Sequence, residues 1–421
     1  MGAARPAPHE PLDELRALAW LAFSELGRAP GGIAEVHRAI AGRIFRATGR
    51  SAAPVRVAHD AISSGVYAAL RAGAQMTGHG FDLALARRRD PAARRLSTTP
   101  RGAAVIGAVI GLRGDSPELE GSPLCEPMSV RVEGEALKLD PTAIAASFPN
   151  AGGRLVVFLH GLMETEFAWQ RGVRQNRGTY GSRLRSDLGL TPVFVRYNSG
   201  RRLSENGREL SELLERLVPA WPVEVTQLAL VGHSMGGLVA RSACHIAVEE
   251  GASWVRLIRH TVSLGSPHMG APIEQGVHLL SAGLAAVPET RPVANFLRRR
   301  SGGIRDLRHG SLTDEDWRGR DHDALRAAAC KEVPLLEGAT HCFVSATITR
   351  SPRHPVGRLL GDSLVLVPSA SGRGRTRQLG FRTEHGAHVG EASHLALLNH
   401  PHVYDRLRGW LAAAPSPSGP A

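Results

Sequence analysis

The sequence predicts a protein of the α/β class, with a mostly parallel central sheet and helices on both faces. Five strand-like apolar runs follow one another along the chain, and amphipathic helical segments separate the first four of them. The runs lie at residues 155–159, 193–197, 228–231, 261–264 and 342–347, and two of the helices are predicted at 203–217 and 238–248. Residues 128–139 read as an antiparallel hairpin at the start of this sheet, turning at Glu133-Gly134.

The chain divides into a predicted helical N-terminal region, 1–125, and a sheet domain, 126–411. The first helix has apolar residues at helical spacing from Leu12 to Leu26 and is predicted to end at Gly27; two more helices are predicted, one carrying Ile33 to Ile44 and one at 57–70. The arginine-rich insertion at 272–335 is predicted to be a helical cap. The Ala/Pro/Ser/Gly-rich tail, 412–421, is predicted to be disordered.

Composition favours a soluble protein that binds no nucleic acid. The net charge is +12, yet only Lys138 and Lys331 are lysines, and arginine supplies the other 49 of the 51 basic residues. No nucleic-acid-binding motif accompanies this charge. The four cysteines show no metal-binding spacing, which is typical of free thiols in a reducing compartment. Because no signal-peptide pattern or membrane-spanning run is seen, we expect a cytoplasmic protein with scope for peripheral membrane contact.

The strongest chemical signal is the segment Gly232-His233-Ser234-Met235-Gly236-Gly237. It follows an apolar strand and precedes an apolar helix, which is the setting of a nucleophile elbow. Gly232 and Gly236 remove side chains that would collide at so sharp a turn. The sequence therefore predicts Ser234 as the nucleophile of an α/β-hydrolase fold, with the helix N-terminus facing the reacting centre.

A serine hydroxyl needs a base, and the base needs an orienting acid. The chain order of this fold is Ser, then Asp or Glu, then His. His394, near the C-terminus, is the favoured base, and its competitors are His385, His388, His400 and His402. Asp362 is the favoured acid, because it follows a strand and a short loop. Asp306, within the predicted cap, is its rival and is otherwise predicted to line the pocket.

Acyl transfer also needs donors for an oxyanion. The strand at 155–159 runs directly into His160-Gly161-Leu162, so the amides of Leu162 and Met235 are the predicted donors. His160, Gly161 and Tyr197 are predicted to face the same pocket. His268, in a turn cluster after the strand at 261–264, is a further candidate for the pocket lining.

Together these motifs resemble bacterial lipases and the related GPI inositol-deacylase-like α/β-hydrolases. The matching pieces are His160-Gly161-Leu162, Tyr197-Asn198-Ser199-Gly200, the elbow continuing to Arg241, Leu264 to Gly270, Gly361-Asp362 and His394-Leu395. The likeness covers roughly residues 150–411. It implies a metal-independent triad of Ser234, Asp362 and His394 that acts on an acyl ester without a cofactor.

The predicted function is therefore that of a serine carboxylic-ester hydrolase, an esterase or lipase, acting on a small-molecule or lipid ester. An acyltransferase would use the same triad, with an alcohol or thiol replacing water. A non-catalytic, membrane-associated binding protein is the third alternative, and the complete triad argues against it.

Overall fold

The computed structural model describes residues 10–48, 53–87, 94–271, 300–320, 330–374 and 377–413. The chain forms two compact units. The first holds the helices α1 (Asp13–Thr48), α2 (Ala53–Ala86) and η2 (Leu96–Thr98), and the second holds α3 (Pro100–Arg113) and the elements from β1 onward. Each unit is described by itself below.

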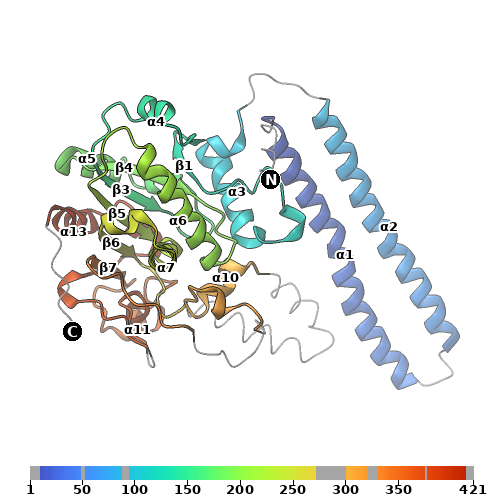
Figure 1. The fold of residues 1–421 in the computed structure, drawn as a ribbon. Coiled ribbons are helices and arrows are strands. Elements are labelled where there is room, and N and C mark those ends of the chain that lie inside the picture. Colours follow the sequence, from blue (N-terminus) through green and yellow to red (C-terminus); the bar gives the residue numbers. More distant parts are fainter. Residues whose placement is uncertain are drawn as a thin grey trace. The chain divides into compact units, whose positions relative to one another are not determined.

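The second unit is built on an eight-stranded, mostly parallel sheet (Figure 1). Its strands are β1 (Ser129–Val132), β2 (Glu135–Ala136), β3 (Arg154–Leu159), β4 (Thr191–Arg196), β5 (Gln227–His233), β6 (Ile258–Leu264), β7 (Thr340–Ala346) and β8 (Gly386–Val389). The order is β2-β1-β4-β3-β5-β6-β7-β8. Only the β1–β2 and β1–β4 pairs are antiparallel. The predicted hairpin and all five predicted strands are confirmed.

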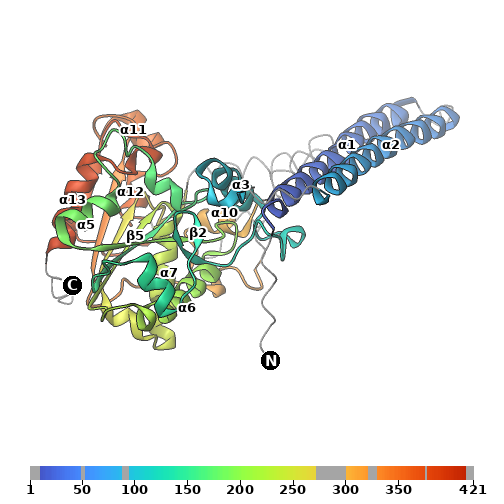
Figure 2. The same cartoon turned by 90° about the horizontal axis from the view of Figure 1, so that it is seen from above.

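The sheet separates two apolar cores, and alternate residues of each strand enter opposite ones. In β3, Leu155 and Val157 lie in one core, whereas Val156 and Phe158 lie in the other. This alternation follows from the pleat of a strand, which turns successive side chains to opposite faces. Both faces are covered, as Figure 2 shows, so every residue of β3 after Arg154 is apolar and buried.

Helices cover the two faces. The helices are α4 (Pro141–Ser147), α5 (Tyr180–Leu188), α6 (Leu203–Ala220), α7 (Met235–Glu250), α10 (Gly302–Leu307), α11 (Pro355–Leu360), α12 (Val367–Ala370) and α13 (Pro401–Ala412). Buried side chains of α6 and α7 pack into the first core, and those of α5 and α13 pack into the second. The helices predicted at 203–217 and 238–248 are thus confirmed as α6 and α7.

The helical prediction for the N-terminus is confirmed, but the predicted helix break at Gly27 is wrong. α1 continues past Gly27 and includes both of the first two predicted helices, and α2 contains the third. The two helices lie side by side (Figures 1 and 2). α2 packs along α1, with Phe23 against Gly78, and this packing outweighs the weak helix propensity of Gly27. No described helix has the length and apolar character needed to cross a bilayer.

Residues 100–120, which include α3, lie in the sheet unit, whereas residues 121–124 lie in the unit of α1 and α2. The apolar run at 102–112 forms α3, and α3 packs within the sheet unit. Asn198, just after β4, donates a hydrogen bond to the Gly114 carbonyl (2.8 Å), and Ser301 donates one to the Gly111 carbonyl (2.6 Å). Glycines at 107 and 111 let the loop around Met163 approach the helix closely. The composition of α3 did not reveal these distant partners.

Much of the predicted cap lies outside the described residues, namely 272–299 and 321–329. Its described part contains the short helix α10, which holds Asp306. Most of the predicted tail, 414–421, also lies outside the described residues, and α13 extends to Ala412.

Replacing Leu230 by Ala should strongly destabilise the sheet unit. Leu230 lies in the central strand β5 and is fully buried, so the variant loses apolar contacts and leaves a cavity. We expect a loss of about 2–5 kcal/mol in the free energy of unfolding, measured by urea denaturation. Val248→Ala on the exposed side of α7 is the control, with an expected change below about 0.5 kcal/mol. Equal effects of the two substitutions would contradict this account of the core.

Candidate active site

Ser234 occupies a strained turn between β5 and α7. Its backbone angles are φ 52° and ψ −120°, a conformation that residues other than glycine rarely adopt. Its amide donates a hydrogen bond to the Leu264 carbonyl at the end of β6 (2.8 Å). A Cβ at Gly232 would collide with the backbone of Gly236 and Gly237. The strand, turn and helix predicted for the elbow are therefore present, and the side chain of Ser234 is only half-buried.

His394 and Asp362 lie together and are both buried. The Nδ1 atom of His394 is 2.8 Å from Oδ2 of Asp362, and the His394 amide donates to the Asp362 carbonyl at 2.9 Å. The other carboxylate oxygen accepts hydrogen bonds from the amides of Leu364 and Val365. An ionised carboxylate only accepts hydrogen bonds, so Nδ1 carries the proton and Nε2 is left as the basic nitrogen. Among the described residues, that Nε2 atom has no hydrogen-bond partner.

Glycines bring Ser234 and the imidazole of His394 to one place. Gly265 directly follows Leu264, whose carbonyl accepts the Ser234 amide. A Cβ on Gly265 would lie 3.1 Å from Cε1 of His394, and its φ of +61° disfavours any side chain there. On the other side, a Cβ on Gly161 would lie 3.1 Å from Cβ of Ser234. Three loops, after β3, β5 and β6, thus meet around Ser234.

The two predicted oxyanion donors border this meeting point. Met235 is the first residue of α7, so its amide has no acceptor within the helix. Leu162 follows Gly161 in the loop after β3. Its amide donates to no acceptor in the described chain, whereas the next amide, that of Met163, donates to Oγ of Ser199 (3.1 Å). Gly107 and Gly111 of α3 lie against the backbone of this loop near Met163.

A buried ion pair, which the sequence analysis missed, joins these loops. Oε2 of Glu164 accepts a hydrogen bond from the Gly161 amide (2.7 Å) and lies 2.9 Å from Nδ1 of His233. The other nitrogen of His233 lies 3.3 Å from the His394 carbonyl. Both neighbours of the imidazole are acceptors, so His233 is doubly protonated. The predicted elbow residue His233 therefore binds the loops that carry Gly161 and His394.

The pKa values of the pair reflect this arrangement. Burial disfavours the charged form of Glu164, but His233 and the Gly161 amide overcome this and lower its pKa to about 2. Burial likewise disfavours charged His233, and the Glu164 carboxylate more than offsets it, so the pKa of His233 is raised.

His160 and Tyr197 contact each other and fix the start of the loop after β3. Their rings stack at 4.2 Å, the Tyr197 amide donates to Nε2 of His160 (3.2 Å), and its hydroxyl donates to the His160 carbonyl (2.6 Å). Burial lowers the pKa of His160 to about 4, so it is a neutral imidazole whose Nδ1 donates to the Gly161 carbonyl. Both residues are fixed in the backbone network of the site.

His268 and Asp306 have partners other than the His394 imidazole. His268 is buried, and its Nδ1 atom accepts from the Arg241 guanidinium (3.3 Å). Asp306 forms an ion pair with Arg202 (2.7 Å) and accepts from the Leu203 amide; burial raises its pKa to about 7. Of the two predicted acids, Asp362 is therefore the one that the structure brings to His394.

Three of the four competing histidines have other neighbours. His388 lies 3.1 Å from the hydroxyls of Ser345 and Thr347, and the rings of His400 and His402 face each other at 5.6 Å. No group of three or more His, Cys, Asp or Glu side chains within the described ranges is arranged to hold a metal ion.

Comparison with known families identifies the fold. Residues 150–290 match the family model of the PGAP1-like alpha/beta domain, and this stretch contains β3 to β6 with the elbow. This is an α/β-hydrolase fold. The family resemblance inferred from the motifs is confirmed over this stretch. No curated protein matches the chain in sequence.

Solved structures of lipases and esterases resemble the chain distantly. The propeptide form of the lipase BlEst2 from Bacillus licheniformis is 15% identical over 64% of this chain, with a TM-score of 0.43, and this chain spans 53% of its length. EstA from Clostridium botulinum is 12% identical over 63% of this chain and 88% of its own, with a TM-score of 0.37. A hyperthermophilic esterase from Pyrobaculum calidifontis is 13% identical over 78% of this chain and 94% of its own (TM-score 0.35).

Replacing Glu164 by Gln should destabilise the protein in a pH-dependent way. The folded pKa of Glu164 is depressed from 4.5 to about 2, so its contribution is fully present above pH 4.5 and is lost as the pH falls through about 2. The folded pKa of His233 is raised from 6.5, so its contribution is fully present below pH 6.5 and is lost as the pH rises through the raised value. The wild type should therefore exceed the variant most at about pH 5.5, by about 3 kcal/mol.

Urea denaturation at about pH 3, 5.5 and 9 measures this difference. The exposed Glu250→Gln is the matched control and should leave stability nearly unchanged at each pH. A difference between wild type and Glu164→Gln that does not vary with pH would show that the pair is not charged in the folded protein.

Proposed function

We propose that this protein is a serine carboxylic-ester hydrolase, with Ser234 as nucleophile, His394 as general base and Asp362 as the acid that orients it. The observation that carries the proposal is the hydrogen bond between buried His394 and Asp362, made beside a strained serine at the start of α7. A strained backbone and a buried carboxylate both cost folding free energy. Such strain is typical of functional sites, and a serine near a histidine that is oriented by a carboxylate is the arrangement of an activated nucleophile.

In the first step, Nε2 of His394 removes the proton of Ser234 as its oxygen attacks the ester carbonyl. Asp362 keeps the proton on Nδ1 and stabilises the imidazolium that forms. The imidazolium then protonates the leaving alcohol, and an acyl-enzyme remains on Ser234. In the second step, His394 takes a proton from water as the water oxygen attacks the acyl carbonyl. The bond to the Ser234 oxygen then breaks, the imidazolium returns its proton to that oxygen, and the acid leaves.

The oxyanion of each tetrahedral intermediate would be held by the amides of Leu162 and Met235. Met235 lies at the N-terminus of α7, where the helix dipole also favours negative charge. The loop carrying Leu162 is fixed on both sides of that residue. Glu164 holds the Gly161 amide, and Ser199 holds the Met163 amide. Glu164 and His233 thereby act as positioning residues for the donor.

Hydrolysis of p-nitrophenyl esters from acetate to palmitate tests the reaction. The wild type should release p-nitrophenol from part of this series, and Ser234→Ala should lose about 10³-fold or more in kcat because no nucleophile remains. Ser363→Ala, at an exposed serine, is the control and should retain activity. The chain-length optimum identifies the acyl group preferred.

Labelling by a fluorophosphonate distinguishes two kinds of failure. If folded wild type hydrolyses no ester but is labelled at Ser234, the nucleophile is correct and the acceptor is not water, as in an acyltransferase. If it is neither labelled nor active, the proposed function is wrong.

Replacing Asp362 by Asn should lower kcat by about 10⁴-fold with little change in KM, because the amide favours the wrong imidazole tautomer. Steady-state kinetics on the best ester measures both constants. Asp405→Asn, at an exposed carboxylate of α13, is the control and should behave as wild type. Equal kcat values for Asp362→Asn and the wild type would remove Asp362 from the triad.

A further inference from the structure

The helix α3 lies outside the stretch that matches the family model, yet one of its faces contacts the loop after β3. A Cβ built on Gly111 would collide with Cγ of Met163 and lie 2.9 Å from its amide nitrogen. A Cβ on Gly107 would lie 3.1 Å from the carbonyl oxygens of Met163 and Glu164. Glycine weakens the interior of a helix, and this close approach of two backbones is the reason for having it there.

The residue that α3 contacts directly follows the proposed oxyanion donor, Leu162. Met163 has a φ of +61°, in the left-handed region that residues with a side chain rarely adopt. Such a conformation persists only where the surrounding structure holds it. The Met163 amide donates to Oγ of Ser199 (3.1 Å), and Gly111 of α3 abuts the same residue. The direction of the Leu162 amide therefore depends on these contacts.

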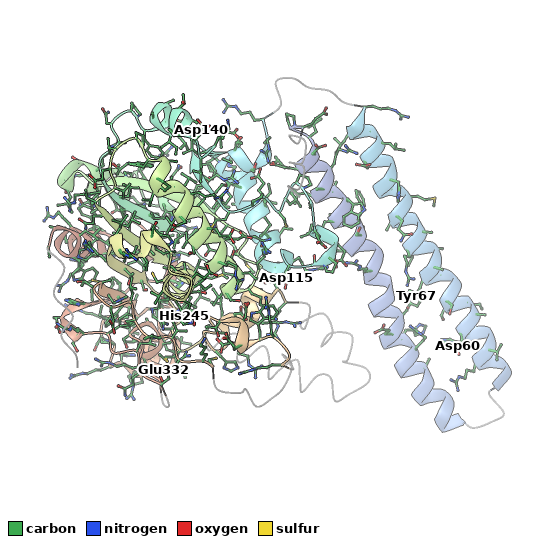
Figure 3. All side chains as sticks on the ribbon, viewed as in Figure 1. Asp60, Tyr67, Asp115, Asp140, His245 and Glu332 are labelled. Carbon is green, nitrogen blue, oxygen red and sulfur yellow. The ribbon has the colours of Figure 1, made fainter. Side chains whose placement is uncertain are left out.

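Hydrogen bonds at the C-terminal end of α3 join it to α10. Ser301 donates to the Gly111 carbonyl (2.6 Å), which belongs to the last turn of α3. Asp115, labelled in Figure 3, follows the helix and accepts a hydrogen bond from the Gly302 amide (2.6 Å). The carbonyls of a last helical turn have no partner within their own helix. The bond from Ser301 therefore holds α3 in place without competing with its helical hydrogen bonds.

The helix α10 in turn contacts the second proposed donor, Met235. A Cβ on Gly303 would lie 3.1 Å from Cε of Met235, and the Gly303 amide donates to the Gly200 carbonyl (2.9 Å). Gly200 directly follows Ser199, the residue that accepts the Met163 amide. α3, α10 and the loop after β4 thus border the parts of the chain that carry the two donors.

We propose that α3 is a positioning element of the active site. Gly111 and Gly107 fix the backbone of Met163, and this directs the Leu162 amide toward the oxyanion. The inference rests on the proposed function and adds to the site a helix from outside the family stretch. A donor stabilises an oxyanion only when it is held where the charge will develop. A shift of about 1 Å in this loop is therefore enough to remove much of the rate.

Replacing Gly111 by Ala tests the effect on catalysis. The new methyl group collides with Met163, so kcat for the best p-nitrophenyl ester should fall by about 10–100-fold with little change in KM. Labelling of Ser234 by a fluorophosphonate should also slow, because the phosphonyl oxygen uses the same donors. Gly409→Ala is the matched control, since a Cβ there in α13 meets no atom within 4 Å, and it should behave as wild type. Equal kcat values for Gly111→Ala and the wild type would overturn the proposal.

A second substitution distinguishes a displaced loop from a weakened fold. Met163→Gly removes the side chain that the new methyl group meets, and the φ of +61° suits a glycine. The double variant Gly111→Ala/Met163→Gly should therefore regain at least part of the kcat that Gly111→Ala loses. A loss of kcat with no recovery in the double variant would give α3 a purely structural role and overturn the proposal.

Hydrogen exchange of the full-length chain separates this inference from the esterase function. In Gly111→Ala the Met163 amide should exchange about tenfold faster or more, because its hydrogen bond to Ser199 is disturbed, and in Gly409→Ala it should not. Unchanged exchange would overturn the role of α3 in holding the loop, whether or not the protein hydrolyses esters. Faster exchange, in a protein whose wild type neither hydrolyses esters nor is labelled, would instead overturn the proposed function and the catalytic part of this inference.

Discussion

The buried ion pair between Glu164 and His233 joins the parts of the site that would otherwise be independent loops. Glu164 holds the Gly161 amide, and His233 adjoins the carbonyl of His394. The pair therefore relates the loop after β3, the turn at Ser234 and the loop that carries His394 to one another. Removing one partner would leave a charge buried without its counterion, which is among the most costly changes a protein interior can undergo. A strained serine can be maintained here because its surroundings are held this firmly.

The strands of the sheet could be predicted from the sequence because burial on both faces requires nearly every residue to be apolar. That holds for β3 and β5. It fails for β8, whose four residues at the sheet edge include Gly386 and His388, too short and too polar to stand out. At Gly27 the sequence predicted a helix end that the structure lacks. The low helix propensity of one glycine is a weak effect, and the packing of α2 on α1 keeps the helix continuous. The membership of α3 in the sheet unit rests on contacts with Asn198 and Ser301, which no local pattern reveals.

The chain order expected for this fold was enough to predict that Asp362 and His394 lie together, because the fold fixes which strand ends come together. It was not enough to find Glu164. A glutamate four residues after His160 looks like any loop residue until the elbow histidine is seen beside it. His268 and Asp306 show the converse: both lie in conspicuous motifs, and their partners Arg241 and Arg202 come from other elements.

The two units hide apolar surface to very different degrees. In the sheet unit, strands and helices bury their apolar residues in two cores, and Ser234 remains half-exposed at the junction of strand and helix. In the helical unit, two long helices can bury only the faces that they turn to each other. α2 nevertheless has apolar residues on both sides, and its charges lie away from the outer one. Its outer side therefore leaves Ile62, Val66 and Met76 largely exposed, because two helices alone cannot enclose a core as a sheet covered on both faces does.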